Sequence, residues 1–439
     1  MLAEPERIKM LNIKELKKYY SGKKVLITGH TGFKGSYMCV LLKYLGAKVY
    51  GYSLKPVKGE LYDLLSKDVK RYAKSKHHDS VGADITRPTS KHLVAGEVFA
   101  DIRDAKKLTA YVKKVKPDYI LHMAAQPLVL TSYEEPAYTY DVNVMGTVNL
   151  LDAIRKIYGG SLVAADTIRP HLRARLKSQI LKLKQKEPVS ILNVTTDKVY
   201  ENNDLSNYAF KESDKLCGHD PYANSKSCSE LVTYSYNKSF FNDKNIFRIS
   251  TARAGNVIGG GDLNKNRIIP DCFRAIKNKK EMLIRNPKSI RPYQFVLEPL
   301  ILYLNIMALQ KKNKGYEGNY NIGPDKKACL TTDILTKKFF TAWQNLVGAN
   351  AVGANTDIVG ADTIRPTVGA NACRALSVSK RAPHEASFLR LDNSLIKKIF
   401  NYKEIFGMDK TMMYTAKVYK DMLLKRNIYQ SILEIISTL

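Results

Sequence analysis

The sequence is poor in cysteine and has no long apolar run. Six cysteines are spread over 439 residues, and no two of them form a Cys-x-x-Cys pair. This spacing argues against a zinc site or a disulfide framework and favours a reducing cytoplasm. No run reaches the roughly 18 consecutive apolar residues of a membrane-spanning helix, so we expect no membrane partner. Residues 1–20 mix Glu4, Glu6 and several lysines, which predicts an added helix rather than a secretory signal.

Acidic side chains are scarce relative to basic ones. The chain has 71 Lys and Arg but 41 Asp and Glu, which gives a formal net charge of +30. Such an excess is also found in nucleic-acid-binding proteins. Here the lysines are scattered rather than gathered with aromatic residues, and no nucleic-acid-binding module is recognisable. We therefore expect no nucleic-acid partner, whereas a diphosphate-bearing substrate would suit the positive charge.

Strand-like and helix-like segments alternate in the first half of the chain. Short apolar runs lie at 24–28, 47–52, 119–123 and 190–194, and helical spacing covers 36–45 and 142–157. This alternation predicts an α/β fold, a doubly wound parallel sheet with helices on both faces. Ligands in such sheets bind beyond the carboxyl ends of the strands.

Three segments interrupt the pattern and resemble one another. Asp84–Pro88, Asp166–Pro170 and Asp362–Pro366 share nearly one pentapeptide, and Val-Gly-Ala-Asn recurs around the third. Their irregular spacing argues against a solenoid. We interpret them as related insertions at about 67–96, 159–185 and 346–381, placed in surface connections that tolerate added length.

A glycine fingerprint follows the first predicted strand. Gly29 permits a tight turn, Gly32 lets a pyrophosphate approach the backbone, and Gly35 lets the next helix lie close to the sheet. This turn, with Thr31 and Phe33, is the candidate dinucleotide site.

The adenosine end of that site is less defined. Asp101 and Ile102, after a later strand, are candidates to meet the adenine. Ser53 and Lys55 stand where an acidic residue would bind the ribose, so this loop leaves NAD and NADP both open.

Two further segments carry acid–base groups. Tyr222 and Lys226 are one helical turn apart, so the ammonium is expected to lower the pKa of the phenol and also to hold the nicotinamide ribose. Thr196 follows a predicted strand and can bond a sugar hydroxyl, while Asp197 and Lys198 offer a proton donor beside a proton acceptor.

Together these motifs make the sequence resemble the extended short-chain dehydrogenase/reductases, and within them the CDP-glucose 4,6-dehydratases. Relatives acting on dTDP-glucose have Thr-Asp-Glu where this chain has Thr196-Asp197-Lys198, so the lysine favours the CDP-glucose branch. The shared segments are Gly29–Ser36, Ala124–Val129, Asn143–Leu151, Asp197–Lys198, Glu201–Asn202, Asp220–Tyr222, Ala252–Asp262, Ile284–Pro287, Arg291–Pro292 and Pro383–Ala386.

The resemblance implies an N-terminal extension at 1–20, followed by a Rossmann-type NAD-binding domain at 21–254. It implies that the segment 255–439 forms mainly a smaller α/β substrate-binding lobe. It implies NAD as cofactor, with Ala124, Ala125 and Gln126 among its contacts. It also implies CDP-glucose as substrate, a homodimer or higher homo-oligomer, and a place in deoxysugar biosynthesis such as that of lipopolysaccharide O-antigen.

The implied reaction is oxidation at C4, water elimination across C5 and C6, and hydride return to C6. Tyr222 would be the base at the 4-hydroxyl, Asp197 the acid at the 6-hydroxyl, and Lys198 the group at the C5 proton. No metal is expected.

The substrate diphosphate would be met by Asn256, Arg267 and Arg291, since guanidinium groups bind phosphate in pairs of hydrogen bonds. The chain departs from the family pattern among these contacts, at Leu130, Leu263, Tyr293 and Phe295. Three alternatives to a CDP-glucose dehydratase therefore stay open. The substrate could be another nucleotide sugar, the reaction could be an epimerisation, or the chain could be a catalytically silent nucleotide-sugar-binding protein.

Overall fold

The computed structural model describes residues 8–73, 90–158, 187–203, 208–241, 246–280, 282, 284, 286–348 and 388–439. Its centre is a seven-stranded sheet in the order β3-β2-β1-β4-β5-β6-β9, in which every neighbouring pair is parallel. The strands are β1 (Lys24–Thr28), β2 (Lys48–Ser53), β3 (Gly96–Phe99), β4 (Tyr119–His122), β5 (Val189–Thr196), β6 (Phe247–Ala254) and β9 (Asn319–Ile322). The strand order reverses between β1 and β4, which is where such sheets bind ligands.

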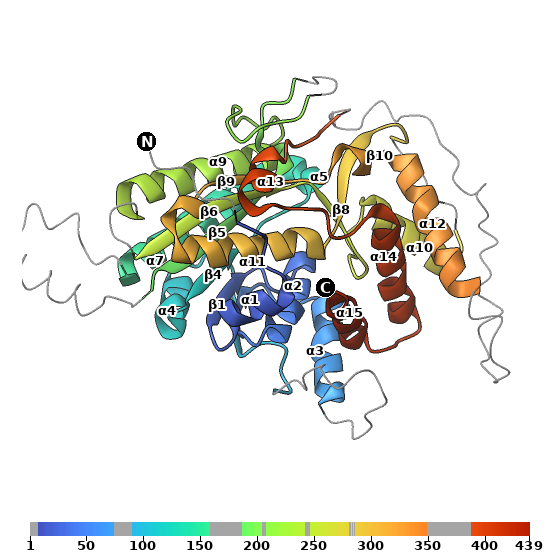
Figure 1. The fold of residues 1–439 in the computed structure, drawn as a ribbon, viewed down its shortest axis with the longest axis horizontal. Helices are drawn as coiled ribbons and strands as arrows, with labels where there is room; N and C mark the ends of the chain where they lie inside the picture. The colour runs from blue at the N-terminus through green and yellow to red at the C-terminus, as the bar shows by residue number, and fades with distance from the viewer. Residues whose placement is uncertain are drawn as a thin grey trace, which may run out of the picture.

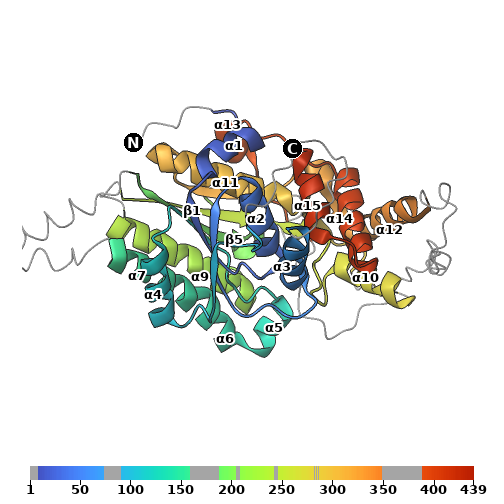
Figure 2. The same ribbon diagram turned by 90° about the horizontal axis from the view of Figure 1, so that it is seen from below.

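Helices cover both faces of this sheet, as Figure 2 shows. One face carries α1 (Ile13–Tyr20), α2 (Phe33–Tyr44) and α11 (Leu297–Lys312), and the other carries α4 (Ala105–Val115), α7 (Gly146–Tyr158) and α9 (Pro221–Tyr236). The shorter elements that connect them are α5 (Val129–Glu134), α6 (Pro136–Tyr140), the π-helices η1 (Asp141–Met145) and η3 (Asn237–Phe241), and the 3-10 helices η2 (Asp197–Val199) and η4 (Lys314–Tyr316). The predicted α/β class is thus what the chain adopts.

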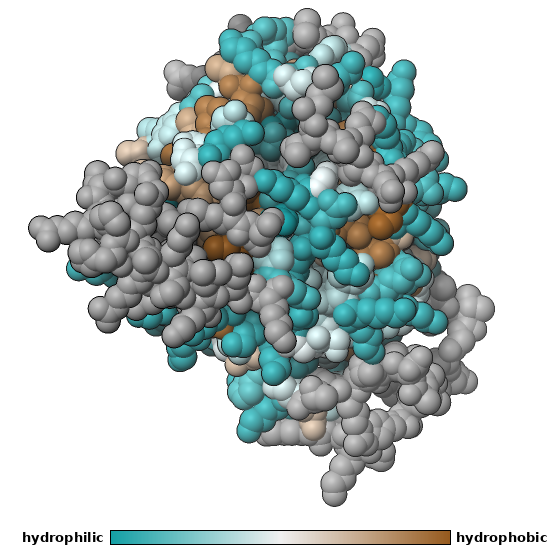
Figure 3. All heavy atoms as spheres, turned by 60° about the vertical axis from the view of Figure 1, so that its left-hand side comes forward, coloured by the Kyte–Doolittle hydropathy of each residue, from teal (hydrophilic) through white to brown (hydrophobic). Residues whose placement is uncertain are grey.

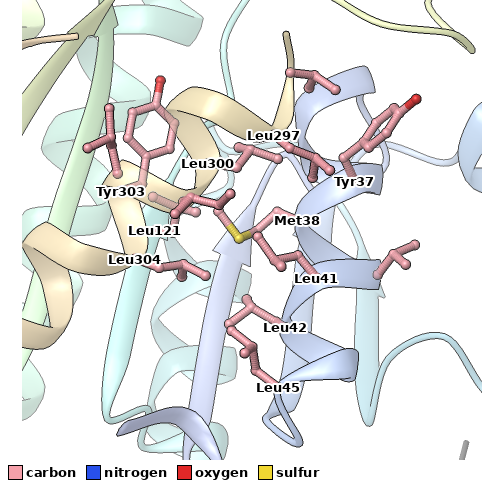
Figure 4. Packing of buried hydrophobic residues seen from close by; sticks show 14 of the residues in the cluster. Tyr37, Met38, Leu41, Leu42, Leu45, Leu121, Leu297, Leu300, Tyr303 and Leu304 are labelled. Atoms are coloured by element: carbon pink, nitrogen blue, oxygen red, sulfur yellow. The ribbon is translucent and has the colours of Figure 1, made fainter. Parts of the chain in front are cut away.

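The helix α2 is buried on nearly all sides because it lies between the sheet and a second layer of helices. Figure 4 shows Met38 and Leu41 of α2 turned toward Leu300 and Leu304 of α11, with Leu121 of β4 close to the two leucines of α11. Burial of each such side chain stabilises the fold by about 1.5–3 kcal/mol. This packing fixes the start of α2, and with it the glycine turn, above the end of β1.

The added helix α1 precedes β1 and packs against α11. It begins with a capping box, in which Asn12 and Glu15 each accept a hydrogen bond from the other's backbone N–H. Its buried Tyr20 donates a hydrogen bond to the Leu304 carbonyl oxygen at 2.7 Å. The extension therefore braces the helix layer that lies over the site.

A smaller lobe lies beside the carboxyl end of the large sheet (Figure 1). Its sheet has the order β10-β8-β7, with β8 parallel to β7 and antiparallel to β10. The lobe is built from β7 (Asn256–Ile258), α10 (Ile268–Asn278), β8 (Ile290–Phe295), η5 (Lys326–Ala328), β10 (Cys329–Thr331), α12 (Thr332–Gly348) and α14 (Met408–Leu423).

The segment after residue 254 serves both parts of the molecule. It supplies β9 and α11 to the large sheet, and α13 (Ser394–Phe400) lies against β9. The last helix, α15 (Ile428–Ser437), packs on α2 and on α3 (Leu61–Tyr72). The expectation that 255–439 is mainly a separate lobe therefore describes only part of it.

The first predicted insertion starts too early. Residues 67–72 belong to α3, where Asp68 is buried and accepts a hydrogen bond from Ile428 N at 2.7 Å. The repeated pentapeptides themselves lie outside the described residues. Among the described helices, none is both long and apolar enough to cross a membrane. The face in Figure 3 is mostly hydrophilic, with a few separate hydrophobic patches.

Candidate active site

A tight turn joins β1 to α2 at the point where the strand order reverses. Gly29 has φ +78°, and a Cβ there would lie 2.7 Å from the Ala124 nitrogen. A Cβ on Gly35 would collide with the Gly29 carbonyl oxygen, so the helix can lie this close only with glycine. Gly32 is exposed at the N-cap of α2, which leaves the first backbone N–H groups of the helix open to an anion.

The loop after β4 lies directly against this turn. The Ala124 nitrogen donates to Thr28 Oγ1 at 3.3 Å, and the Gln126 nitrogen donates to Asn143 Oδ1 at 2.8 Å. The Gln126 side chain is buried and donates to Thr139 Oγ1 at 2.9 Å. Gln126 therefore shapes the loop, and the backbone of Met123 and Ala124 is the part that borders the glycine turn, with Ala125 next in the chain.

The side chains predicted to contact the adenine, those of Asp101 and Ile102, interact with other residues of the protein. The carboxylate of Asp101 pairs with the Arg103 guanidinium at 2.9 Å, and this hydrogen bonding holds the pKa of Asp101 below its usual value. Ile102 is buried, and a Cβ on Gly146 would lie 2.7 Å from it. Both residues follow β3 as expected, but their side chains are largely engaged.

The helix α9 presents Tyr222 and Lys226 to the site. Its N-cap Asp220 accepts a hydrogen bond from Ala223 N at 2.8 Å, which sets the start of the helix. Lys226 is buried and donates to the Val194 carbonyl oxygen of β5 at 2.9 Å. Burial lowers the pKa of Lys226 to about 8, although nearby Glu230 raises it.

The expected lowering of the Tyr222 pKa is not found. Burial raises the pKa of Tyr222 to about 12, and the charge of Asp197 adds to the rise. A hydrogen bond with Thr196 and the charge of Arg267 act in the opposite direction but do not cancel it. Sequence spacing predicted a nearby ammonium, but Lys226 is not among the groups that shift the pKa of Tyr222, and spacing does not report how much water the fold removes from the phenol.

Thr196 and Asp197 stand at the carboxyl end of β5. Thr196 Oγ1 donates to Asp197 Oδ1 at 3.0 Å and also shares the hydrogen bond with Tyr222. Asp197 is buried, and its Oδ2 has no hydrogen-bond partner among the described residues. Desolvation raises the pKa of Asp197 above its usual value, partly offset by Lys198, Thr196 and Arg291. A raised carboxyl pKa suits a proton donor.

The remaining predicted residues surround this centre. Lys198 is half-buried on η2 and close enough to Asp197 to affect its pKa. Arg267 pairs with Asp262 at 2.9 Å, and Arg291 is buried on β8. Asn256 begins β7 and is paired in register with Tyr293 of β8. The small lobe thus brings its two arginines within electrostatic reach of Asp197 and Tyr222.

A buried ion pair behind the site was missed by the sequence analysis. Arg253 of β6 binds both carboxylate oxygens of Glu230, at 2.9 and 2.8 Å, and both side chains are almost fully buried. Thr195 and Thr251 donate to the same carboxylate. The only signal in the sequence that could have found Glu230 was its position, one helical turn after Lys226.

Lys34 was also missed. It lies in the first turn of α2, where a cation opposes the helix dipole, and this position is the signal that marks it as unusual. Its Nζ lies 5.7 Å from the centre of the Tyr303 ring. Burial, then the charges of Lys226 and Arg267, lower the pKa of Lys34 to about 7, while Asp197 opposes this shift. Lys34 therefore belongs to the same electrostatic centre.

The arrangement fits a dinucleotide and a polar substrate. The glycine turn provides a bare helix N-terminus, and the buried Asp197 Oδ2 calls for a hydrogen-bonding partner that the described residues do not supply. The described residues contain no group of three or more side chains suited to hold a metal ion.

Comparisons with known proteins agree with this geometry. A family model described as the NAD dependent epimerase/dehydratase family matches residues 25–323. A CDP-glucose 4,6-dehydratase of Salmonella typhimurium (strain LT2) is 33% identical over 410 residues, covering 92% of this chain and 92% of that protein. A GDP-mannose 4,6-dehydratase of Vibrio cholerae is 35% identical over 133 residues, covering 30% of this chain and 31% of that protein.

Solved structures share the architecture at low identity. A dTDP-glucose 4,6-dehydratase from Bacillus anthracis, solved in complex with NAD, has a TM-score of 0.58 at 16% identity and covers 91% of this chain and 97% of that one. An epimerase from Methanothermobacter thermautotrophicus has a TM-score of 0.62 at 17% identity over 97% of each chain. These likenesses confirm the predicted Rossmann-type fold.

Proposed function

Because the chain belongs to the NAD dependent epimerase/dehydratase family, we propose that it is a 4,6-dehydratase converting CDP-glucose to CDP-4-dehydro-6-deoxyglucose. The observation that carries this proposal is the contact of Thr196 with both Tyr222 and Asp197. An oxidation at C4 and an elimination at C6 need a base and an acid in one site, and this trio provides them. The likeness to the Salmonella dehydratase extends over nearly the whole chain, which supports the same reaction class.

The coenzyme would be held by this chain's own backbone and one lysine. The turn Gly29–Gly35 offers N–H groups for the pyrophosphate, Ala124 borders it with Ala125 next in the chain, and Lys226 is placed for the ribose next to the nicotinamide. When bound, NAD would supply the reversible hydride acceptor that an oxidation at C4 and a reduction at C6 both need.

Tyr222 acts as the base at the 4-hydroxyl. Its raised pKa means that the phenol needs nearby positive charge to give up its proton, and Arg267 provides part of this charge. Thr196 orders the hydroxyl that receives the substrate proton. The ketone formed at C4 then makes the C5 proton acidic.

Asp197 donates a proton to the departing 6-hydroxyl, since burial favours its protonated form. Lys198, in its neutral amine form, takes the C5 proton and gives it back when C6 is reduced. At the end of one cycle Tyr222 has gained a proton and Asp197 has lost one. Thr196 contacts both, so it offers a direct route for that proton to return.

Asn256, Arg267 and Arg291 are proposed to hold the diphosphate of the substrate. Bidentate guanidinium groups match phosphate oxygens, and both arginines come from the small lobe that faces the end of β5. In this arrangement the large sheet binds the coenzyme, and the small lobe binds the nucleotide of the substrate.

We also infer a homodimer formed through α6, η1 and α9. Large apolar side chains on these helices are exposed to solvent, namely Tyr140, Met145, Leu231 and Tyr234. Arg103, Tyr138 and Cys228 line an open hollow of about 670 Å³ on the same face. A cytoplasmic location is proposed as well, and the free state of the five described cysteines agrees with a reducing compartment.

The direct test is incubation with a series of nucleotide sugars. We expect CDP-glucose to give a 4-keto product that absorbs in alkali, and dTDP-, UDP- and GDP-glucose to react more slowly. A sugar inverted at one centre, with no loss of water, would instead establish an epimerase. Folded protein that binds coenzyme but converts no nucleotide sugar would contradict the proposal.

A further inference from the structure

The short helix η2 carries Asp197 and Lys198, and its last residue is held from two sides. The Val199 carbonyl oxygen accepts a hydrogen bond from the Cys217 nitrogen at 2.9 Å and another from Ser227 Oγ at 2.8 Å. Val199 and Ser227 are both buried, so water does not compete for these bonds. The end of η2 is therefore fixed to the turn before α9 and to α9 itself.

Ser227 makes this connection with a single hydroxyl. Its Oγ also accepts a hydrogen bond from the Gly218 nitrogen at 3.1 Å. Gly218 can lie this close to α9 only without a side chain, because a Cβ there would be 2.5 Å from the Ala223 carbonyl carbon. One buried hydroxyl thus joins η2, the turn before α9 and the helix.

This contact differs from the usual behaviour of a serine inside a helix. Such a serine commonly donates to the carbonyl oxygen four residues earlier. For Ser227 that oxygen belongs to Ala223 and lies 3.1 Å away, whereas the Val199 oxygen outside the helix is closer, at 2.8 Å. Ser227 also follows Lys226 directly on the helix that begins near Tyr222. It therefore links the helix proposed to serve the oxidation with the loop proposed to serve the elimination.

The side chain of Lys198 depends on the backbone of this loop for its position. Its amine makes no ion pair or hydrogen bond with the described residues. Asp197 differs, because its carboxylate accepts a hydrogen bond from Thr196. A shift at Val199, the next residue along the chain, would thus displace Lys198 more readily than Asp197.

We propose that Ser227 is a positioning residue for the elimination of water, because it fixes the Val199 carbonyl group and thereby Lys198. The inference rests on the proposed function, in which Lys198 takes the C5 proton. A displacement of about 1 Å caused by a substitution outside the reacting centre can slow a reaction by about 10²-fold. Loss of the Ser227 hydroxyl should therefore slow the elimination while the oxidation at C4, which uses Tyr222, continues.

Transient kinetics with CDP-glucose separate these two steps. The absorbance of reduced nicotinamide rises with the oxidation at C4 and falls with the reduction at C6, which can only follow the elimination. In Ser227→Ala we expect this absorbance to accumulate, because elimination slows by about 10–100-fold. The rate of its first rise should change by less than about threefold. CDP-glucose deuterated at C5 should show a larger isotope effect on kcat in this variant than in the wild type.

Three variants serve as controls. Ser229→Ala removes another buried hydroxyl of α9, one that contacts Thr147 and Asn193 instead of η2, and should cause no accumulation. Ser227→Cys keeps a weaker donor in the same place and should fall between the wild type and Ser227→Ala. In a Lys198→Met background, Ser227→Ala should slow the elimination no further, because it acts through the missing amine.

The outcomes separate this inference from the proposed function. If Ser227→Ala matches Ser229→Ala in both the accumulation and the C5 isotope effect, Ser227 has only a structural role and the inference is wrong. Independent, additive losses for Ser227→Ala and Lys198→Met would also overturn it. If the wild-type protein converts no nucleotide sugar, the proposed function fails first.

Discussion

At the scale of single residues, Thr196 connects the two groups that we propose exchange protons with the substrate. Its hydroxyl contacts both Tyr222 and Asp197, and the second oxygen of Asp197 is left for a ligand. The types and positions of these residues were predictable from the sequence. Their protonation was not, because the pKa of Tyr222 depends on burial that only the folded chain creates.

Replacing Tyr222 with Phe removes only the hydroxyl. We expect kcat to fall by about 10²–10⁴-fold, the usual contribution of a positioned acid or base. Coenzyme binding and the circular dichroism spectrum should be unchanged. Tyr234→Phe is the matched control, since Tyr234 is 62% exposed on the same helix. Near-normal turnover in Tyr222→Phe would exclude this phenol as the base.

Thr196 can be tested by a pair of substitutions. Thr196→Ser keeps the hydroxyl and should retain most of the activity, whereas the nearly isosteric Thr196→Val should lose about 10²-fold in kcat. Steady-state kinetics with CDP-glucose provide the comparison. Equal activity in the two variants would mean that the Thr196 hydroxyl neither transfers a proton nor positions the Tyr222 hydroxyl.

At the scale of elements, one buried carboxylate holds three of them together. Glu230 of α9 binds Arg253 and Thr251 of β6 and Thr195 of β5. These bonds fix α9 relative to β5, the strand that ends at Thr196. Removing one partner of a buried ion pair leaves an unpaired charge in the interior.

The stability of this pair can be measured by urea unfolding. We expect Arg253→Met to lower the free energy of unfolding by about 3–5 kcal/mol. Arg155→Met removes a more exposed pair with Asp152 on α7 and should cost about 1 kcal/mol or less. Similar losses in both variants would show that the buried pair has no special role.

Lys226, also on α9, predicts that kcat/KM depends on pH. Lys226 is a base whose pKa is lowered to about 8, so it loses its charge as the pH rises through that value. We expect kcat/KM to decline there, because the amine proposed to hold the nicotinamide ribose loses its positive charge. Glu230 raises the pKa of Lys226, so Glu230→Gln should move the decline to lower pH. An unchanged profile in that variant would argue against Lys226 as the titrating group.

Most elements that position the site could be predicted from local pattern. The runs at 24–28, 119–123 and 190–194 became β1, β4 and β5, because apolar residues ending at glycine or polar residues mark buried parallel strands. The start of the first insertion could not be placed, since α3 extends to Tyr72 through contacts with α15 far along the chain. Local sequence does not report such contacts.

At the scale of the whole molecule, the chain returns to its first domain after building the second. The strand β9 and the helices α11 and α15 complete the coenzyme-binding layer, although they follow the small lobe's first strand. A boundary drawn from motif order alone misses this return. The charge of Arg267 in the small lobe helps to lower the pKa of Lys34 on α2, so the two parts lie within electrostatic reach of each other.

The proposed dimer face gives a prediction at the same scale. Light scattering should report a dimer for the wild-type protein and a monomer for the double variant Leu231→Glu/Tyr234→Glu, because two exposed apolar residues of α9 become charged. Ile334→Glu, at another exposed apolar position, should stay dimeric. A wild-type monomer would remove the basis for this interface.

If one site oxidises C4, removes water and reduces C6 of the same sugar, as we propose, the hydrogen that leaves C4 must reappear at C6. CDP-glucose deuterated at C4 tests this most directly, with the product analysed by mass spectrometry and NMR. We expect loss of one water and recovery of the deuterium at C6 of the same molecule. Product that keeps its 6-hydroxyl, or in which the deuterium is absent from C6, would contradict it.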